Sequence, residues 1–319
     1  MAQYFTERLQ KVFHMIFTSY NQNMAQEGLR QLELIVNNQQ NPSQLKDRAL
    51  RNDKTSRLES DIDTKEDALK IANDSEAREL GDAYALLARV YAGPRFTWEE
   101  SNFPEDNMRT YQCLHDSIRR CSPIGTLQAL RIKGSITPTV EKDMQISFDD
   151  AFRIVYDHAN RGDAYCQYVI GNVFFWRDDN RIDSAEAMLT PPPMSWTKRI
   201  QRSLTANSVR DRIAALQGTV PDEKLQKNAS NLAKEWFNKA LDNGLAMFQG
   251  NLRNIYIDEA DFSNARRVAK TAAELGNPAM MLYTGLDCHE NGKFEDAFTW
   301  FTKGAALGQS ESIAELADY

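Results

Sequence analysis

The side chains that could carry acid–base or metal chemistry are few and widely spaced in this sequence. Two of the four histidines precede an acidic residue directly, as His115-Asp116 and His289-Glu290. Adjacent residues on a helix point in different directions, so neither pair has the geometry of a catalytic dyad. The run "DIDTKED" at 61–67 has two interpretations: its carboxylates hold a metal ion, or they cap and solvate the start of a helix.

Sequence motifs for common catalytic sites are also missing. The chain contains no glycine-rich phosphate loop, no nucleophile elbow and no zinc-type Cys/His spacing. We therefore expect a protein that is not an enzyme and that has no cofactor and no metal. Catalytic triads assemble from residues far apart in the chain, so Ser and Cys nucleophiles remain an open alternative.

The four cysteines are expected to be reduced. Cys113 and Cys121 lie eight residues apart in a helical pattern, which separates them by ~12 Å along the helix axis. A disulfide needs Cα atoms within ~7 Å, so these two cannot pair within one helix. Cys166 and Cys288 are isolated, and free cysteines are usually buried as small apolar residues.

Composition and charge indicate a soluble protein. The 319 residues are 42% hydrophobic and 26% charged, with a net charge of -7, which disfavours nucleic acid as a partner. The N-terminal stretch has charges inside its apolar pattern, unlike a signal peptide, and no run approaches the ~20 apolar residues of a membrane span. We expect a cytoplasmic protein that binds neither nucleic acid nor membrane.

Elements that could position a binding surface are visible as an internal repeat. Gly244, Gly276 and Gly308 are each 32 residues apart, and the phrase Trp-Phe-x-Lys occurs before the first and last of them. Small or apolar residues stand eleven, seven and four positions before each Gly, and Ala151, Val155 and His158 stand at the same distances before Gly162. Such positions share one helix face, and small residues there let a neighbouring helix approach closely. The pattern predicts helices that pack in series and end at Gly.

The residues after each Gly predict the start of the next helix. Asp82, Asp163 and Asn277 are good N-caps, and Pro278 falls at the first helical position. Apolar residues then follow at helical spacing, for example Gly171 and Gly285 with their neighbours. Each period therefore holds two antiparallel helices with almost no loop between periods.

Two helices per period of about 34 residues is typical of tetratricopeptide-type repeats. The Gly at the helix end, followed by a polar cap, resembles the Sel-one-like variety of that superfamily, most closely in "TWFTKGAALGQSES". The resemblance covers about 230–319 well, 148–176 fairly and 66–135 weakly. It implies an all-α fold, a right-handed α-α superhelix (solenoid) of antiparallel helix pairs. It also implies a scaffold or adaptor that binds proteins in the groove of the superhelix.

The period is interrupted in places, which predicts the domain organisation. Residues 1–60 are expected to form a helical cap, with amphipathic helices at 4–20 and 24–36, and residues 61–319 to hold the repeats. A Pro-containing insert is predicted at about 177–228. Its basic stretch "WTKRIQR" is a solvated helix face, a contact to an acidic partner or a lid on the groove.

In solenoids of this kind the first helix of each pair lines the concave face. Counting from the glycines predicts the residues on that face, and aromatic rings with an amide among them suit peptide recognition. An error of one position in this count would make the same residues core. The predicted partner-binding residues are Tyr84, Tyr91, Tyr165, Tyr168, Asn172, Phe175, Asn254 and His289.

These observations favour a non-catalytic scaffold or adaptor that binds a protein or peptide in its groove. The acidic charge suggests one narrower role, an immunity-type or secretion-associated protein. The alternative is an enzyme or regulatory subunit with a site in the groove beneath the insert. The C-terminal "ESIAELADY" lacks an obvious polar capping helix, so two alternatives are open for this end: a partner covers it, or a second copy of the chain does, which would be self-association.

Overall fold

A computed structural model describes residues 3–40, 64–131, 142–175, 222–247 and 249–317. These residues form helices and turns, and no strand occurs among them. The helices are α1 Glu7–Phe13, η1 His14–Thr18, α2 Gln22–Gln40, α4 Lys65–Asn73, α5 Glu79–Tyr91, η2 Pro94–Phe96, η3 Glu99–Ser101, α6 Asn107–Arg119, α7 Pro123–Arg131, α9 Phe148–Asn160, α10 Ala164–Phe175, α14 Asp222–Asp242, α15 Gly250–Asp258, α16 Phe262–Glu274, α17 Pro278–Glu290, α18 Phe294–Ala306 and α19 Ser310–Ala317.

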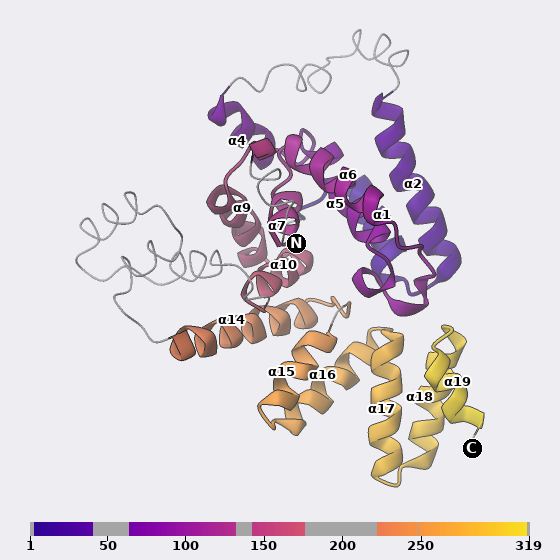
Figure 1. Cartoon of the computed structure of the whole chain (residues 1–319). Coiled ribbons are helices and arrows are strands. Elements are labelled where there is room, and N and C mark those ends of the chain that lie inside the picture. Colours follow the sequence, from indigo (N-terminus) through magenta and orange to yellow (C-terminus); the bar gives the residue numbers. More distant parts are fainter. Residues whose placement is uncertain (1–2, 41–63, 132–141, 176–221, 248, 318–319) are drawn as a thin grey trace.

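Successive helices pack against each other as pairs, which confirms the all-α solenoid. Contacts run along the chain from α5 with α6 to α9 with α10, then α10 with α14, α16 with α17 and α18 with α19. In Figure 1 the array starts above with α4 to α10, passes through α14, and ends with α17 to α19 near the lower end of α2. No described helix has the combination of length and hydrophobicity that crossing a bilayer demands.

The predicted glycine stops are present in four repeats, and two of them are followed by a predicted cap. Gly162, Gly244, Gly276 and Gly308 all have positive φ, between +87° and +98°, where a side chain would be strained. The side chain of Asp163 then accepts the N–H of Cys166, and that of Asn277 accepts the N–H of Met280. At these two stops the next helix begins four residues after the previous one ends, whereas α15 begins at Gly250, eight residues after the end of α14 at Asp242.

The predicted seams of small residues face inward and form a repeated contact. Gly171 and Gly285 each lie nine residues after a glycine stop, at 162 and 276. A Cβ placed on Gly171 would lie 2.6 Å from the ring of Phe237, and one on Gly285 would collide in the same way with Phe301. The missing side chain lets each phenylalanine, at 1% exposure or less, fill the gap between helices.

The first repeat departs from the expected pattern. Asp82 was expected to cap a helix, but α5 begins three residues earlier at Glu79, so Asp82 lies in the first turn. Its carboxylate binds the side chain of Arg78, four residues before it, and is only 1% exposed. Asp82 does not cap the helix because its carboxylate instead pairs with the buried guanidinium of Arg78.

The N-terminal residues do more than cover one end of the array. Helix α2 packs on α5 and on the η3 turn, as a cap over the first repeat would. Residues 3–22, which we call the strap, instead run along the turns that join one repeat to the next. The strap contains α1 and the π-helix η1 and ends at the first residue of α2.

Candidate functional site

The strap meets the inter-repeat turns in the order in which they occur in the chain. Its Tyr4 binds Asp163, which follows the first glycine stop. Further along, a Cβ on Gly276 would lie 3.5 Å from the ring of Tyr20, and a Cβ on Gly308 would lie 3.8 Å from the amide nitrogen of Gln22. One peptide segment thus lies against the turns of three repeats, at 162, 276 and 308.

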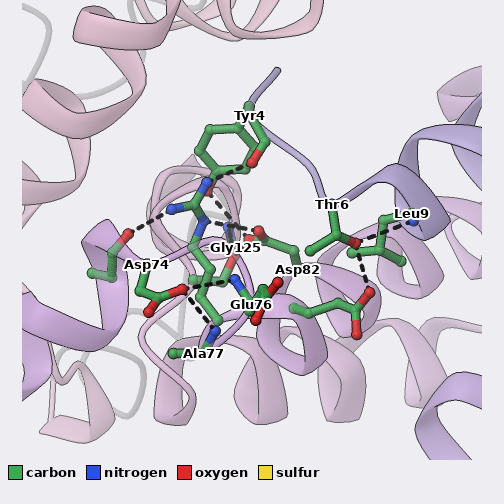
Figure 2. Close-up of polar contacts among 12 residues, drawn as sticks. Tyr4, Thr6, Leu9, Asp74, Glu76, Ala77, Asp82 and Gly125 are labelled. Atoms are coloured by element: carbon green, nitrogen blue, oxygen red, sulfur yellow. Dashed lines mark hydrogen bonds and ion pairs between the residues drawn. The ribbon is translucent and has the colours of Figure 1, made fainter. Parts of the chain in front are cut away.

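Tyr4 forms hydrogen bonds to the repeats through both its backbone and its side chain (Figure 2). Its N–H donates to Asp163 Oδ2 at 2.9 Å, and its carbonyl accepts from Arg78 Nη2 at 2.6 Å. Its hydroxyl donates to Asp82 Oδ1 at 3.2 Å, and the guanidinium of Arg78 lies 4.0 Å from the ring centroid. The backbone N–H, the carbonyl and the side chain of Tyr4 are therefore all held.

The charges around Tyr4 are balanced within the protein. Arg78 is fully buried and also donates to the carbonyl of Ala72, while Asp82 accepts from Arg78, Tyr4 and the Ser122 hydroxyl. Burial raises the pKa of the Asp82 carboxyl, and the charge of Arg78 opposes that rise. Hydrogen bonds from three donors stabilise the ionised form of this carboxyl group.

His158 lies against the same residue, with its ring centroid 5.2 Å from that of Tyr4. Burial lowers the pKa of this histidine, and the positive charge of Arg78 lowers it further. The neutral imidazole therefore packs on the strap as an aromatic surface.

Large apolar side chains hold the rest of the strap. Eight of them are 3% exposed or less: Tyr4, Phe5, Leu9, Val12, Phe13, Ile16, Phe17 and Tyr20. Each such side chain contributes about 1.5–3 kcal/mol when it is buried, so the eight together contribute on the order of 10 kcal/mol. The indole N–H of Trp98 adds a bond of 2.9 Å to the carbonyl of Ile16. The strap belongs to the core and is not a loosely held ligand.

Five of the predicted partner-binding residues are buried in this arrangement. Tyr165 packs against two strap rings, at 5.5 Å from Phe5 and 4.7 Å from Phe13. Four others are 8% exposed or less: Tyr84, Tyr91, Tyr168 and Asn172. Tyr165 therefore lies beneath the strap, at 5% exposure.

The buried tyrosines have partners within the fold. The Tyr91 hydroxyl donates to Glu33 of α2 at 2.8 Å, and the Tyr168 hydroxyl accepts from Arg89 at 2.7 Å. The guanidinium of Arg120 lies 4.9 Å from the centroid of the Tyr84 ring. Aromatic residues at inward positions suit a core as well as a groove, which is why their sequence pattern could not separate the two.

The other three predicted residues remain accessible. Asn254 on α15 and His289 on α17 are exposed, and Phe175 at the end of α10 is half-buried. Leu282 and Leu286 are half-buried and share a face of α17 with His289, because the three are spaced by four and three residues. We call Asn254, Leu282, Leu286 and His289 the C-terminal stripe.

Contacts between neighbouring helices hold the helices that carry the C-terminal stripe. The guanidinium of Arg253 on α15 lies 3.9 Å from the ring centroid of Tyr283 on α17, and Arg266 on α16 forms a 2.6 Å ion pair with Asp287 of α17. Contacts of this kind fix the spacing between neighbouring repeats. The exposed side chains therefore stand on a rigid framework, as a docking surface requires.

The acidic run at the start of α4 is a helix cap in its described part. Thr64 accepts the N–H of Asp67 through its side chain, and its hydroxyl donates to the Asp67 carboxylate at 2.6 Å. Asp61 and Asp63 lie outside the described residues, as do Pro191–Pro193, the basic stretch at 196–202 and most of the predicted insert. Within the described ranges, no group of three His, Cys, Asp or Glu side chains could hold a metal ion.

The sequence patterns did not identify the residues that organise the strap. They assigned no role to Arg78, and they placed Tyr4 only in an amphipathic helix of the cap. One signal was available: the apolar residues from Tyr4 to Phe17 cover more than one helix face, which is unusual for a helix with an exposed side. The i, i+4 spacing of Arg78 and Asp82 was a second.

Comparison with known proteins identifies little beyond the fold class. No family model matches the chain, and no curated protein is similar enough to match it. Among solved structures, the chain is similar to a Sel1 repeat protein from Oxalobacter formigenes, with 14% identity over 98% of this chain and 85% of that chain. The TM-score is 0.25, so the two chains do not superpose as wholes. The fold rests on the helix pairs described above.

Proposed function

We propose that this chain is a non-catalytic protein-binding scaffold or adaptor whose partner docks on the C-terminal stripe. The observation that carries the proposal is the strap. Side chains from separate repeats already recognise one peptide segment through its N–H, its carbonyl and its rings. A repeat array that binds a peptide from its own chain along one row of turns has the chemistry to bind another on a neighbouring face.

The position of the stripe supports this choice of surface. The strap covers the turns and the aromatic wall around Tyr165, whereas Asn254 and His289 stay open to solvent. Half-buried Leu282 and Leu286 supply apolar area, and the flanking amide and imidazole supply hydrogen bonds. This combination of an apolar centre and a polar rim is that of a modest protein interface.

Site-specific crosslinking in cells tests the proposal. The full-length chain would carry a photo-reactive benzoylphenylalanine at Asn254, at His289 or, as the control, at Lys270 on α16, whose side chain is 66% exposed. We expect one protein to be captured from both stripe positions and not from Lys270. Equal capture from all three positions, or none from the stripe, would refute it.

Reconstitution then separates binding from incidental proximity. The captured protein, once purified, should bind the chain directly, and His289→Glu or Asn254→Arg should weaken binding at least about tenfold, or 1.4 kcal/mol. Both positions are exposed, so the melting temperature should not change. The identity of the partner would also show whether the narrower immunity-type or secretion-associated role applies, and we place the protein in the cytoplasm as part of the proposal.

A further inference from the structure

One turn in the row is not filled by the strap. Between the contacts of Tyr4 and Tyr20, a pocket of about 290 Å³ separates η1 from the turn at residues 243–246. Its wall is made by Phe13, His14 and Thr18 of the strap, by Asp163 and Tyr165 of the preceding repeat, and by Leu275 of the next. The pocket therefore lies where three repeats and the strap come together.

The gap coincides with the π-helical turn of the strap. Ser19 donates its N–H to the carbonyl of His14 at 3.0 Å, an i to i+5 bond, and the His14 ring is bonded to the Thr18 hydroxyl at 2.6 Å. A π-turn widens the backbone and is found often at functional sites. Here it turns two polar side chains toward the pocket wall while Ile16 and Phe17 stay in the core.

The charges on the wall favour a positively charged guest. Asp163 is the lining residue with a formal negative charge, and neither Lys nor Arg is among the described residues that line the pocket. Asp163 is 8% exposed, and its two oxygens each accept one backbone N–H, from Cys166 and from Tyr4. Each carboxylate oxygen has two acceptor sites, so capacity remains for a donor from the pocket.

The guanidinium of Arg78 is already bonded within the fold. It donates to Asp82 and to the carbonyls of Ala72 and Tyr4. Burial lowers the pKa of His158, whose ring packs on Tyr4, so this imidazole adds no positive charge at neutral pH.

Shape and aromatic content narrow the class of guest. Pockets that enclose whole small-molecule ligands measure about 300–1,000 Å³, so this one is of the size for a single long side chain. Phe13, Tyr20 and Tyr165 contribute rings to the wall. A planar guanidinium stacks on rings of this kind and donates to a carboxylate at the same time.

We propose that this pocket binds one arginine side chain of the protein partner, with the guanidinium against the aromatic rings and hydrogen-bonded to Asp163. The identification of the donor as a protein rests on the proposed function, whereas the chemistry of the pocket does not. The C-terminal stripe and the pocket then form two parts of one interface, one apolar and one acidic.

Small probes test the pocket on the full-length protein without the partner. Nα-acetyl-arginine methylamide and its uncharged analogue Nα-acetyl-citrulline methylamide would be compared by saturation-transfer NMR at low ionic strength. We expect the arginine probe to bind at least about tenfold more tightly than the citrulline probe. Equal binding of the two, or binding of neither, would overturn the proposal.

A charge series at Leu275 locates the binding. Leu275 lines the pocket and is 40% exposed, so it tolerates substitution. Relative to Leu275→Gln as the neutral reference, Leu275→Glu should strengthen binding of the arginine probe several-fold and Leu275→Lys should abolish it. Lys270→Glu, on an exposed face of α16, should have no such effect. If Lys270→Glu changes binding as much as Leu275→Glu, the probe reports surface charge and the assignment is wrong.

The two proposals fail separately. Crosslinking from Asn254 and His289 does not depend on the pocket, and probe binding does not depend on any partner. Probe binding without a crosslinked protein would retain the pocket and reject the scaffold role. A crosslinked partner whose binding is unchanged by Leu275→Lys would retain the scaffold role and reject the pocket as its arginine site.

Discussion

The backbone N–H of Tyr4 donates to Asp163 Oδ2 at 2.9 Å, joining residues 159 positions apart. The other oxygen of the same carboxylate caps α10 through the N–H of Cys166. One side chain therefore starts a repeat helix and holds the strap. Removing the strap would therefore expose both this helix cap and the core surface that the strap side chains cover.

The buried ion pair between Arg78 and Asp82 should contribute more to the free energy of unfolding than an exposed ion pair does. Asp82→Asn leaves the fully buried Arg78 without its counter-charge, and breaking a buried pair in this way costs about 3–5 kcal/mol. Urea unfolding monitored by circular dichroism measures the loss. Glu66→Gln, which removes an exposed partner of Lys70, should leave the unfolding midpoint unchanged. Similar effects of the two substitutions would contradict the buried pair.

His158 should titrate below its ordinary pKa of 6.5, because burial and the charge of Arg78 disfavour the imidazolium. A depressed pKa in the folded state means that the unfolded chain binds the proton more readily. Stability from the neutral ring is therefore full above pH 6.5 and is lost as the pH falls through the folded-state value. NMR of the ring protons gives the midpoint directly.

The same linkage predicts how a variant behaves. His158→Gln cannot take up the proton, so the stability of the natural chain relative to this variant should be smaller at pH 5 than at pH 7.5. A midpoint at or above 6.5, or a difference that does not depend on pH, would show that His158 is not buried against Tyr4.

The seam between α10 and α14 should not tolerate an added methyl group. Gly171→Ala places a Cβ 2.6 Å from the ring of Phe237, so we expect a loss of about 1–3 kcal/mol in the free energy of unfolding. Gly250→Ala, at the first residue of α15, meets no described atom within 4 Å and should leave stability equal or slightly higher. Thermal unfolding of the two variants against the natural chain gives the comparison. Equal tolerance at both positions would contradict the packing.

Thiol reactivity should distinguish Cys288 from the other cysteines. All four cysteines are free, and Cys288 is half-exposed, whereas Cys113, Cys121 and Cys166 are buried. Burial raises the pKa of Cys113 to about 12 and of Cys121 to about 12, which suppresses their thiolates. We expect Ellman's reagent to modify one thiol fast in the native protein, and Cys288→Ser to remove that phase. Fast modification of two or more thiols would contradict the burial.

Local signals in the sequence were enough to predict the repeats. A glycine that needs positive φ, an Asp or Asn cap after it and a seam of small residues before it all act within a few residues of each other. Such features carry the same meaning wherever the chain later folds, so the helix ends at 162, 244, 276 and 308 were predicted correctly. The contact of Gly171 with Phe237 follows from the same repeat spacing.

The identity of the binding surface could not be predicted in the same way. Tyr165 on an inward helix face fits a peptide groove and a packed core equally well, because both bury an aromatic ring. Whether a partner or the chain itself covers that ring depends on residues more than a hundred positions away. Whether Asn254 and His289 are covered or exposed depends in the same way on distant segments, and in the fold both are exposed.

The sequence by itself therefore determined the helices, their ends and their pairing, since these depend on backbone conformation and on neighbours three to four residues apart. Only the tertiary structure decided that residues 3–22 lie along the turns, that Arg78 and Asp82 are buried as a pair beneath Tyr4, and that a pocket opens beside His14. These arrangements come from the balance of charge and apolar area between distant segments, for which the spacing of residues carries no local signal.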